Sequence, residues 1–176
     1  MKVEPVLPAM HSRVAWVFGD DFDIDQIIGV ENIKVQDLDV LSKVAMNGFD
    51  PDFAASLSPG DVLVGGRNFG YGHPHAAAMR TMRHLGIKAV IAESFFSSYW
   101  IGEIGYGFTQ VICPGISKKV ERFDQVEIDF TALVLRVVRT NEELPIMPYS
   151  KRDVRILMAG GLKNVLAEEN TTNTSK

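Results

Sequence analysis

Apolar runs alternate with amphipathic segments along the first two thirds of the chain, and this alternation predicts strands separated by helices. Strand-like apolar runs occupy residues 13–18, 61–64, 87–92 and 108–113. Apolar residues at helical spacing occupy 35–45, 51–57, 74–85 and 93–104. The run at 61–64 leads through one helix and a turn at Gly86 into the run at 87–92, so these two strands are expected to be parallel neighbours.

The last third of the chain has a different pattern. Residues 125–130 alternate between polar and apolar, and 132–138 are rich in β-formers, which predicts a hairpin with its turn near 130–132. Pro145 and Pro148 then separate the sheet from a helix at 151–159, which continues at 162–166 after a glycine break. We expect a single domain over residues 1–167 and a disordered polar tail over 168–176.

The segment 65–86 combines a strand end, a glycine-rich turn and a helix start. The turn at 68–72 reads Asn-Phe-Gly-Tyr-Gly, and His73, Pro74 and His75 follow it where the helix begins. Glycines allow close approach of the backbone to a ligand, and the free N–H groups and dipole of a helix start favour a carboxylate or phosphate. Simple chain reversal is the alternative, since neither a Walker A loop nor a GxGxxG fingerprint is present.

Four aspartates lie within six residues at positions 20, 21, 23 and 25. Clustered carboxylates suit a hard cation, although the later glycine and glutamate of an EF-hand are missing. A solvated turn whose aspartates cap the next element is a second interpretation. In a third, one aspartate faces an active site and orients a donor. The polar segment at 29–58 also has two interpretations: it forms a lid over a site, or it forms a pair of helices that covers the core.

Composition excludes several classes of function. The chain has 176 residues, 46% of them hydrophobic, and a formal net charge of −4, so no electrostatic footprint for nucleic acid or an anionic membrane is present. A single cysteine, Cys113, forms no internal disulfide and cannot by itself hold an iron–sulfur cluster. With no signal-peptide pattern and no apolar run of membrane-spanning length, a cytoplasmic protein is expected.

Four segments, in order, resemble the small subunit of 3-isopropylmalate dehydratase, the swivelling domain of the aconitase superfamily. Residues 19–28 are similar to the family's Gly-Asp-x-Ile-Asp-Thr-Asp-Gln-Ile-Ile, and residues 68–72 to its Asn-Phe-Gly-Cys-Gly. Residues 85–95 match its Leu-Gly-x-x-Ala-Val-Ile-Ala-x-Ser-Phe, and 156–162 its Ile-Leu-x-Ala-Gly-Gly-Leu. The resemblance spans nearly the whole chain.

The resemblance implies an α/β fold: a swivelling β/β/α domain with a mixed sheet and flanking helices. It also implies a heteromer in which a separate large subunit carries a four-iron four-sulfur cluster, while this chain alone binds no cofactor. In that family the cluster iron acts on the departing hydroxyl of a small hydroxyacid, and the small subunit supplies the base and the carboxylate-binding groups. No nucleic acid or membrane partner is implied.

The sequence departs from the family where its chemistry resides. The family continues Gly-Ser-Ser-Arg-Glu-His after the turn, so its serine base aligns with His73 and its arginine with His75. Its Ser-Phe-Ala-Arg is Ser-Phe-Phe-Ser at 94–97 here, which removes a second arginine, and the threonine between the paired aspartates is Ile24.

Three interpretations follow. In the favoured one the chain is a hydro-lyase subunit with an altered substrate and base: His73 removes the proton, His75 or the helix start binds a carboxylate, and Asp25 orients one of them. In this interpretation Arg67 partly replaces a lost arginine. The expected substrate-binding set is Asp23, Arg67, Asn68, Gly70, Tyr71 and Gly72. The alternatives are a catalytically silent regulatory or assembly subunit, and a stand-alone metal-binding protein using His73, His75 and an aspartate.

Overall fold

The computed structural model describes residues 6–73 and 75–174, so Pro74, expected near the start of a helix, lies outside the described residues. Its centre is one seven-stranded sheet with the order β4-β3-β2-β1-β5-β6-β7. The strands are β1 (Met10–Val17), β2 (Val62–Gly65), β3 (Ala89–Ala92), β4 (Thr109–Ile112), β5 (Gln125–Asp129), β6 (Val134–Val137) and β7 (Glu142–Pro145).

The sheet has a parallel and an antiparallel half that meet at β1. Strands β1 to β4 pair in parallel, with Val62 opposite Ala89 and Gly65 opposite Ala92 between β2 and β3. Strands β1, β5, β6 and β7 pair in antiparallel order, and β5 and β6 form the predicted hairpin. The mixed α/β sheet and the parallel crossover from β2 to β3 are therefore confirmed.

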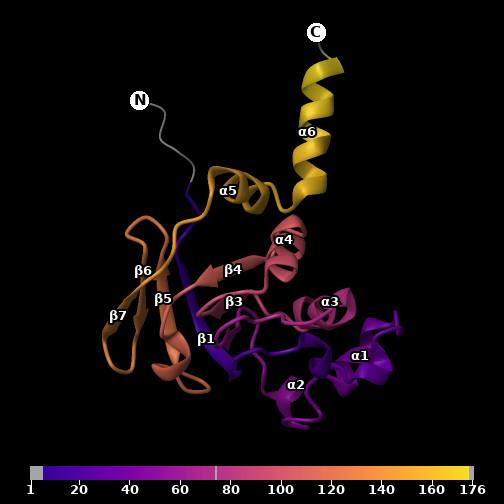
Figure 1. Cartoon of the computed structure of the whole chain (residues 1–176), viewed down its shortest axis with the longest axis vertical. Coiled ribbons are helices and arrows are strands. Elements are labelled where there is room, and N and C mark those ends of the chain that lie inside the picture. Colours follow the sequence, from indigo (N-terminus) through magenta and orange to yellow (C-terminus); the bar gives the residue numbers. More distant parts are fainter. Residues whose placement is uncertain (1–5, 74, 175–176) are drawn as a thin grey trace.

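The helices form two groups beside the sheet (Figure 1). The group on the β1–β3 side contains α1 (Leu38–Val44), α2 (Phe53–Ser56) and α3 (Ala76–His84), with the short 3-10 turns η1 (Ile24–Ile27) and η2 (Val30–Asn32). The other contains α4 (Ser97–Gly105), α5 (Lys151–Met158) and α6 (Leu162–Thr174), while η3 (Ile116–Lys118) follows β4. The antiparallel strands lie at the opposite side of the molecule from α1–α3 (Figure 1).

Burial explains these placements. The face of α3 that carries Ala78, Met79 and Met82 is fully buried against the parallel strands, as its helical spacing predicts. A second apolar cluster fills the inside of the curled antiparallel half and includes Val126, Ile128, Leu135 and Val137. The segment after β7 closes this curl, because Ile146 N–H donates to the Leu133 carbonyl and Met147 N–H to the Ile112 carbonyl on β4.

The excursion at 29–58 forms a packed layer. Asp37 caps α1 by accepting hydrogen bonds from the N–H groups of Asp39 and Val40, so the helix begins later than its apolar pattern predicts. Leu41, Met46 and Phe53 are all fully buried in the same core as α3. Of the two interpretations of this excursion, this packing favours covering helices.

Two segments differ from the sequence prediction. Strand β7 lies where the sequence predicts only a separator at Pro145. The proline ends the strand at the outer edge of the sheet, where it removes no ladder hydrogen bond. Residues 168–174, expected to be disordered, continue α6. No glycine or proline interrupts this helix, and Arg155 of α5 forms a 2.8 Å ion pair with Glu169. The division into one domain and a tail stays a prediction.

Candidate functional site

The loops that follow β1, β2 and β3 meet at the carboxyl ends of these parallel strands. Arg67, after β2, reaches back to Asp20, after β1: its backbone N–H donates to Oδ1 at 2.7 Å, and its guanidinium donates to Oδ2. The Arg67 N–H, and secondarily its guanidinium, lower the pKa of the Asp20 carboxyl. Carboxyl ends of parallel strands are the usual place for ligand sites in open α/β sheets.

Asn68 ties all three loops together. Its backbone N–H donates to the Ser94 hydroxyl, after β3, at 2.8 Å, and its side-chain amide donates to Asp21 at 2.7 Å. Asn68 has a φ of +58°, a left-handed conformation that asparagine tolerates better than most residues. The predicted substrate-binding asparagine therefore has a clear role in holding the loops.

The glycines of the turn serve packing as well as access. Gly70 is buried with a φ of +83°, and a Cβ there would lie 2.2 Å from the Tyr99 ring. Gly72 has a φ of +95°, and a Cβ there would lie 3.6 Å from an Asp23 carboxylate oxygen. Gly70 thus faces the core, whereas Gly72 lines the open side of the turn.

His75 is held by Asp25 at two points. One oxygen of the Asp25 carboxylate accepts the His75 backbone N–H at 3.1 Å, and the other lies 2.6 Å from His75 Nδ1. Asp25 is buried, while the His75 side chain is 48% exposed. With the Nδ1 proton donated to Asp25, Nε2 keeps its lone pair, which is the arrangement a general base requires.

Asp25 is itself placed by η1. The side chain of Asp23 caps this turn by accepting the Asp25 N–H at 3.0 Å, and Ile24 and Ile27 anchor the turn in the core. Residues 20, 21, 23 and 25 therefore have four different tasks, as partners of Arg67, Asn68, the η1 backbone and His75. No group of three or more metal-ligating side chains occurs among residues 6–73 and 75–174.

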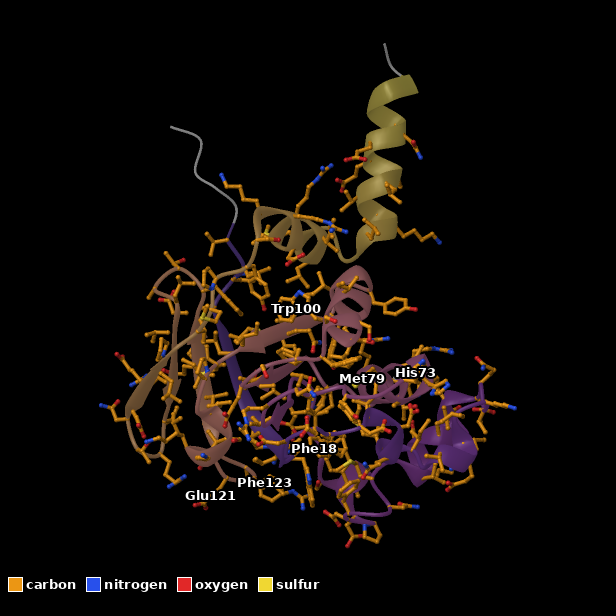
Figure 2. All side chains as sticks on the ribbon, viewed as in Figure 1. Phe18, His73, Met79, Trp100, Glu121 and Phe123 are labelled. Atoms are coloured by element: carbon orange, nitrogen blue, oxygen red, sulfur yellow. The ribbon has the colours of Figure 1, made fainter. Side chains whose placement is uncertain are left out.

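An open depression of about 470 Å³ lies in front of the two histidines. Gly72, His73, His75, Phe96 and Ser98 line it. Figure 2 shows His73 toward the periphery, while Met79 of α3 lies inside. His75 and Phe96 are the N-cap residues of α3 and α4, and neither side chain caps its helix, so the first N–H groups of the two helices are not capped from within. A carboxylate in the depression would meet imidazoles and uncapped helix starts.

Several residues at this site escaped the sequence analysis. Ser94 lies in the Ser-Phe motif that carries the family resemblance, so that motif could have indicated it. Residues 93–96, predicted as helix, form a loop instead, because Phe96 N–H donates to the Phe69 carbonyl at 2.9 Å. Glu93 contacts the Ser117 hydroxyl after β4, a pairing that only the order of the strands brings about.

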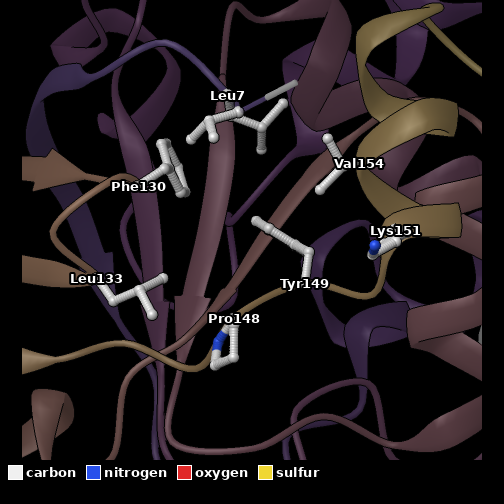
Figure 3. A pocket seen from close by; sticks show the side chains of 8 residues that line it. Leu7, Phe130, Leu133, Pro148, Tyr149, Lys151 and Val154 are labelled. Atoms are coloured by element: carbon white, nitrogen blue, oxygen red, sulfur yellow. The ribbon is translucent and has the colours of Figure 1, made fainter. Parts of the chain in front are cut away.

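A second cavity lies at the mouth of the curled half, as Figure 3 shows. It measures about 260 Å³, and its lining is mainly apolar, with Lys151 as the one charged residue among those that line it. The Tyr149 hydroxyl donates to the Gln110 carbonyl, and burial raises its pKa. Without a histidine or a carboxylate, this lining offers no acid–base pair.

Cys113 is fully buried at the end of β4, and burial raises the pKa of its thiol to about 12. A protonated, enclosed thiol is a poor ligand for a cluster. Among the described residues, the structure contains no helix with the length and apolarity needed to cross a membrane.

No family model matches the chain. Among curated relatives, the 3-isopropylmalate dehydratase small subunit 1 of Methanopyrus kandleri is 37% identical over 155 residues, 88% of this chain and 91% of the relative. The isopropylmalate/citramalate isomerase small subunit of Methanocaldococcus jannaschii is 34% identical over 88% of this chain and 92% of the relative. The methanogen homoaconitase small subunit of Methanothermobacter thermautotrophicus is 35% identical over 85% and 86%. A crystal structure of 3-isopropylmalate dehydratase from M. jannaschii has a TM-score of 0.85 at 30% identity and covers 96% of this chain and 99% of its own.

Proposed function

Because this chain belongs to the family of 3-isopropylmalate dehydratase small subunits, we propose that it acts in a heteromeric hydro-lyase whose base is a histidine. Its partner would be a large subunit, and its substrate a malate-like or other small hydroxyacid. The observation that carries the proposal is the contact between Asp25 and Nδ1 of His75, a residue that lines the depression together with a second imidazole, that of His73. The family's serine and arginine are absent at these two positions, so the chemistry has to come from other side chains.

The geometry favours His75 over His73 as the base. His75 is oriented by a buried carboxylate through both its ring and its backbone, whereas His73 is exposed and no hydrogen bond fixes its ring among the described contacts. Nε2 of His75 would take the proton from the substrate carbon, the C–H electrons would form the carbon–carbon double bond, and the C–O bond would break to release hydroxide, which a proton from solvent converts to water. His73 and the uncapped starts of α3 and α4 would hold a carboxylate, with Arg67 and Asn68 shaping the adjoining wall.

An iron–sulfur cluster would fit the partner and not this chain, because the single thiol here is buried and three or more ligating side chains are not gathered in the described part of the chain. When present on a large subunit, such a cluster would supply the Lewis acid that draws off the hydroxyl. This chain would contribute the base, its orientation and the carboxylate contacts.

The test is anaerobic co-expression with the cognate large subunit, followed by a dehydration assay over a panel of malate derivatives and other hydroxyacids. We expect His75→Ala to lower kcat about 10³-fold while the complex still forms, since a positioned base contributes roughly 10² to 10⁴. His73→Ala should raise KM more than it lowers kcat. The matched control is His84→Ala, on the same helix but paired with Asp39 at 3.2 Å outside the depression.

A His75→Ala variant that turns over at the wild-type rate would overturn the assignment of the base. A stable complex that dehydrates no compound of the panel would instead identify a catalytically silent subunit, a role that the loss of the family's serine and arginine also fits.

A further inference from the structure

Two aromatic rings form an apolar wall beside the histidines. Phe96 lines the depression, and the Tyr71 ring packs edge-on against it, with 6.0 Å between ring centroids and an interplanar angle of 72°. The Tyr71 side chain remains exposed, at 51% of its full accessible area. We call Tyr71 and Phe96 the aromatic wall.

A backbone hydrogen bond holds the chain at or next to each ring residue. Tyr71 stands between two glycines with positive φ, and Gly70 N–H donates to the Phe22 carbonyl at 2.9 Å. Phe96 is the N-cap residue of α4, and its own N–H donates to the Phe69 carbonyl. A ring with a fixed base and an open face loses little conformational freedom when a ligand packs on it.

Cationic side chains are scarce at this wall. The residues after Phe96 are Ser97 and Ser98, and the Arg67 guanidinium is already occupied by Asp20. Where the family motif reads Ala-Arg, the chain reads Phe96-Ser97, so a ring is gained next to a lost positive charge. Among the described residues of this wall, a second carboxylate of a substrate would find no unpaired cationic side chain, whereas an apolar group would find two rings to pack on.

We infer that the substrate carries an aromatic substituent, in place of the small alkyl group in the relatives' names, and that this ring packs on the aromatic wall while a carboxylate meets the histidines. This inference rests on the proposed function and specifies its substrate class. The rings do not close the site, because about 470 Å³ of the depression remains open in front of Phe96 and half of Tyr71 is accessible. If the two rings occupied the depression, only a smaller substituent would fit.

The experiment uses the complete complex and a series of malates that bear a methyl, an isopropyl or a benzyl group. Both kcat/KM and the dissociation constant from calorimetry are measured for each compound. We expect kcat/KM to rise about tenfold or more from isopropyl to benzyl in the wild type, since one methylene in an apolar pocket is already worth about tenfold. Tyr71→Ala and Phe96→Ala should flatten this rise, and Phe96→Leu should restore part of it.

Tyr106→Ala is the control, because Tyr106 is an exposed aromatic residue of α4's end that stacks on Arg83 outside the depression. Equal or falling kcat/KM from isopropyl to benzyl would overturn the inference and leave the hydro-lyase intact. Benzylmalate binding that depends on the wall, without turnover, would support the inference and overturn the proposed reaction. Failure of Tyr71→Ala to form the complex would assign that ring to the subunit interface and overturn the inference.

Discussion

The amino and carboxyl ends of the parallel strands carry similar arginine–aspartate pairs, but the two pairs differ in their exposure to solvent. At the amino end, Arg13 donates to both oxygens of Asp61, whose side chain is only 3% exposed, and to the Ser56 carbonyl. At the carboxyl end, the Arg67 guanidinium donates twice to a single oxygen of Asp20, Oδ2, and the two side chains are 73% and 41% exposed. The same pair of residue types is thus enclosed at one end and open at the other.

Aromatic rings account for part of this difference. At the amino end, Phe123 is flanked by the guanidinium groups of Arg13 and Arg122, at 5.0 Å and 4.6 Å from the ring centroid. Figure 2 shows Phe123 and Glu121 at an edge of the molecule away from His73. At the carboxyl end, rings such as Phe96 line an open depression instead of covering the charges. Removing one partner of an enclosed pair is costly, because it leaves a buried charge unpaired, whereas an exposed pair contributes little to stability.

The largest expected effect is on catalysis at the open end. Asp25→Asn should lower kcat of the complex roughly 10² to 10³-fold with little change in KM, because the amide holds the His75 ring less well than the carboxylate and offers the wrong tautomer a partner. Steady-state kinetics of the complete complex measure this. Asp39→Asn, at the exposed pair with His84, is the control and should behave as wild type. An equal fall in kcat for both variants would show that the contact between Asp25 and His75 has no specific role in catalysis.

The next effect is on stability at the enclosed end. Asp61→Ala leaves a partly buried guanidinium and the Ser58 N–H without their acceptor, and we expect the free energy of unfolding to fall by about 3 kcal/mol. Urea denaturation at neutral pH measures it. Asp20→Ala removes the partner of an exposed arginine and should change the unfolding free energy far less. Equal losses in the two variants would abolish the distinction between the two ends.

The smallest effect is a pH dependence, also at the enclosed end. The Arg139 guanidinium, by hydrogen bonding, lowers the pKa of the buried Asp124 carboxyl below its ordinary value. The stabilisation by the carboxylate is therefore present above an ordinary aspartate pKa of about 4, and it is lost as the pH falls through the lowered folded-state value.

Between about pH 5 and pH 2, the wild type should accordingly lose more unfolding free energy than Asp124→Asn, by about 1 kcal/mol or less. Urea titrations at several pH values measure the difference. Asp129→Asn is the control, because Asp129 accepts only turn N–H groups from Thr131 and Ala132 in the contacts described. Parallel pH profiles for wild type and Asp124→Asn would contradict the prediction.

Much of the fold follows from local pattern. The apolar runs predicted β1 to β4 and the hairpin of β5 and β6, because strand spacing and turn residues act over a few positions. The edge strand β7 was missed, since its four residues end in proline and their pairing with β6 depends on a distant partner. The helix α4 starts later than predicted, because the Phe96 N–H donates a hydrogen bond to the Phe69 carbonyl. These two residues are 27 positions apart, so local sequence does not indicate their contact.

What the sequence determined by itself is the family, the kinds of side chain at the site and the loss of the serine and arginines, since these are matters of residue identity and order. Only the tertiary structure decided which aspartate meets which partner. Asp20, Asp21 and Asp25 lie 47 to 50 residues from Arg67, Asn68 and His75, and the sequence could not assign these pairs. The parallel pairing of β1 and β2 brings their carboxyl ends together, and this places a buried carboxylate against His75 and not against His73.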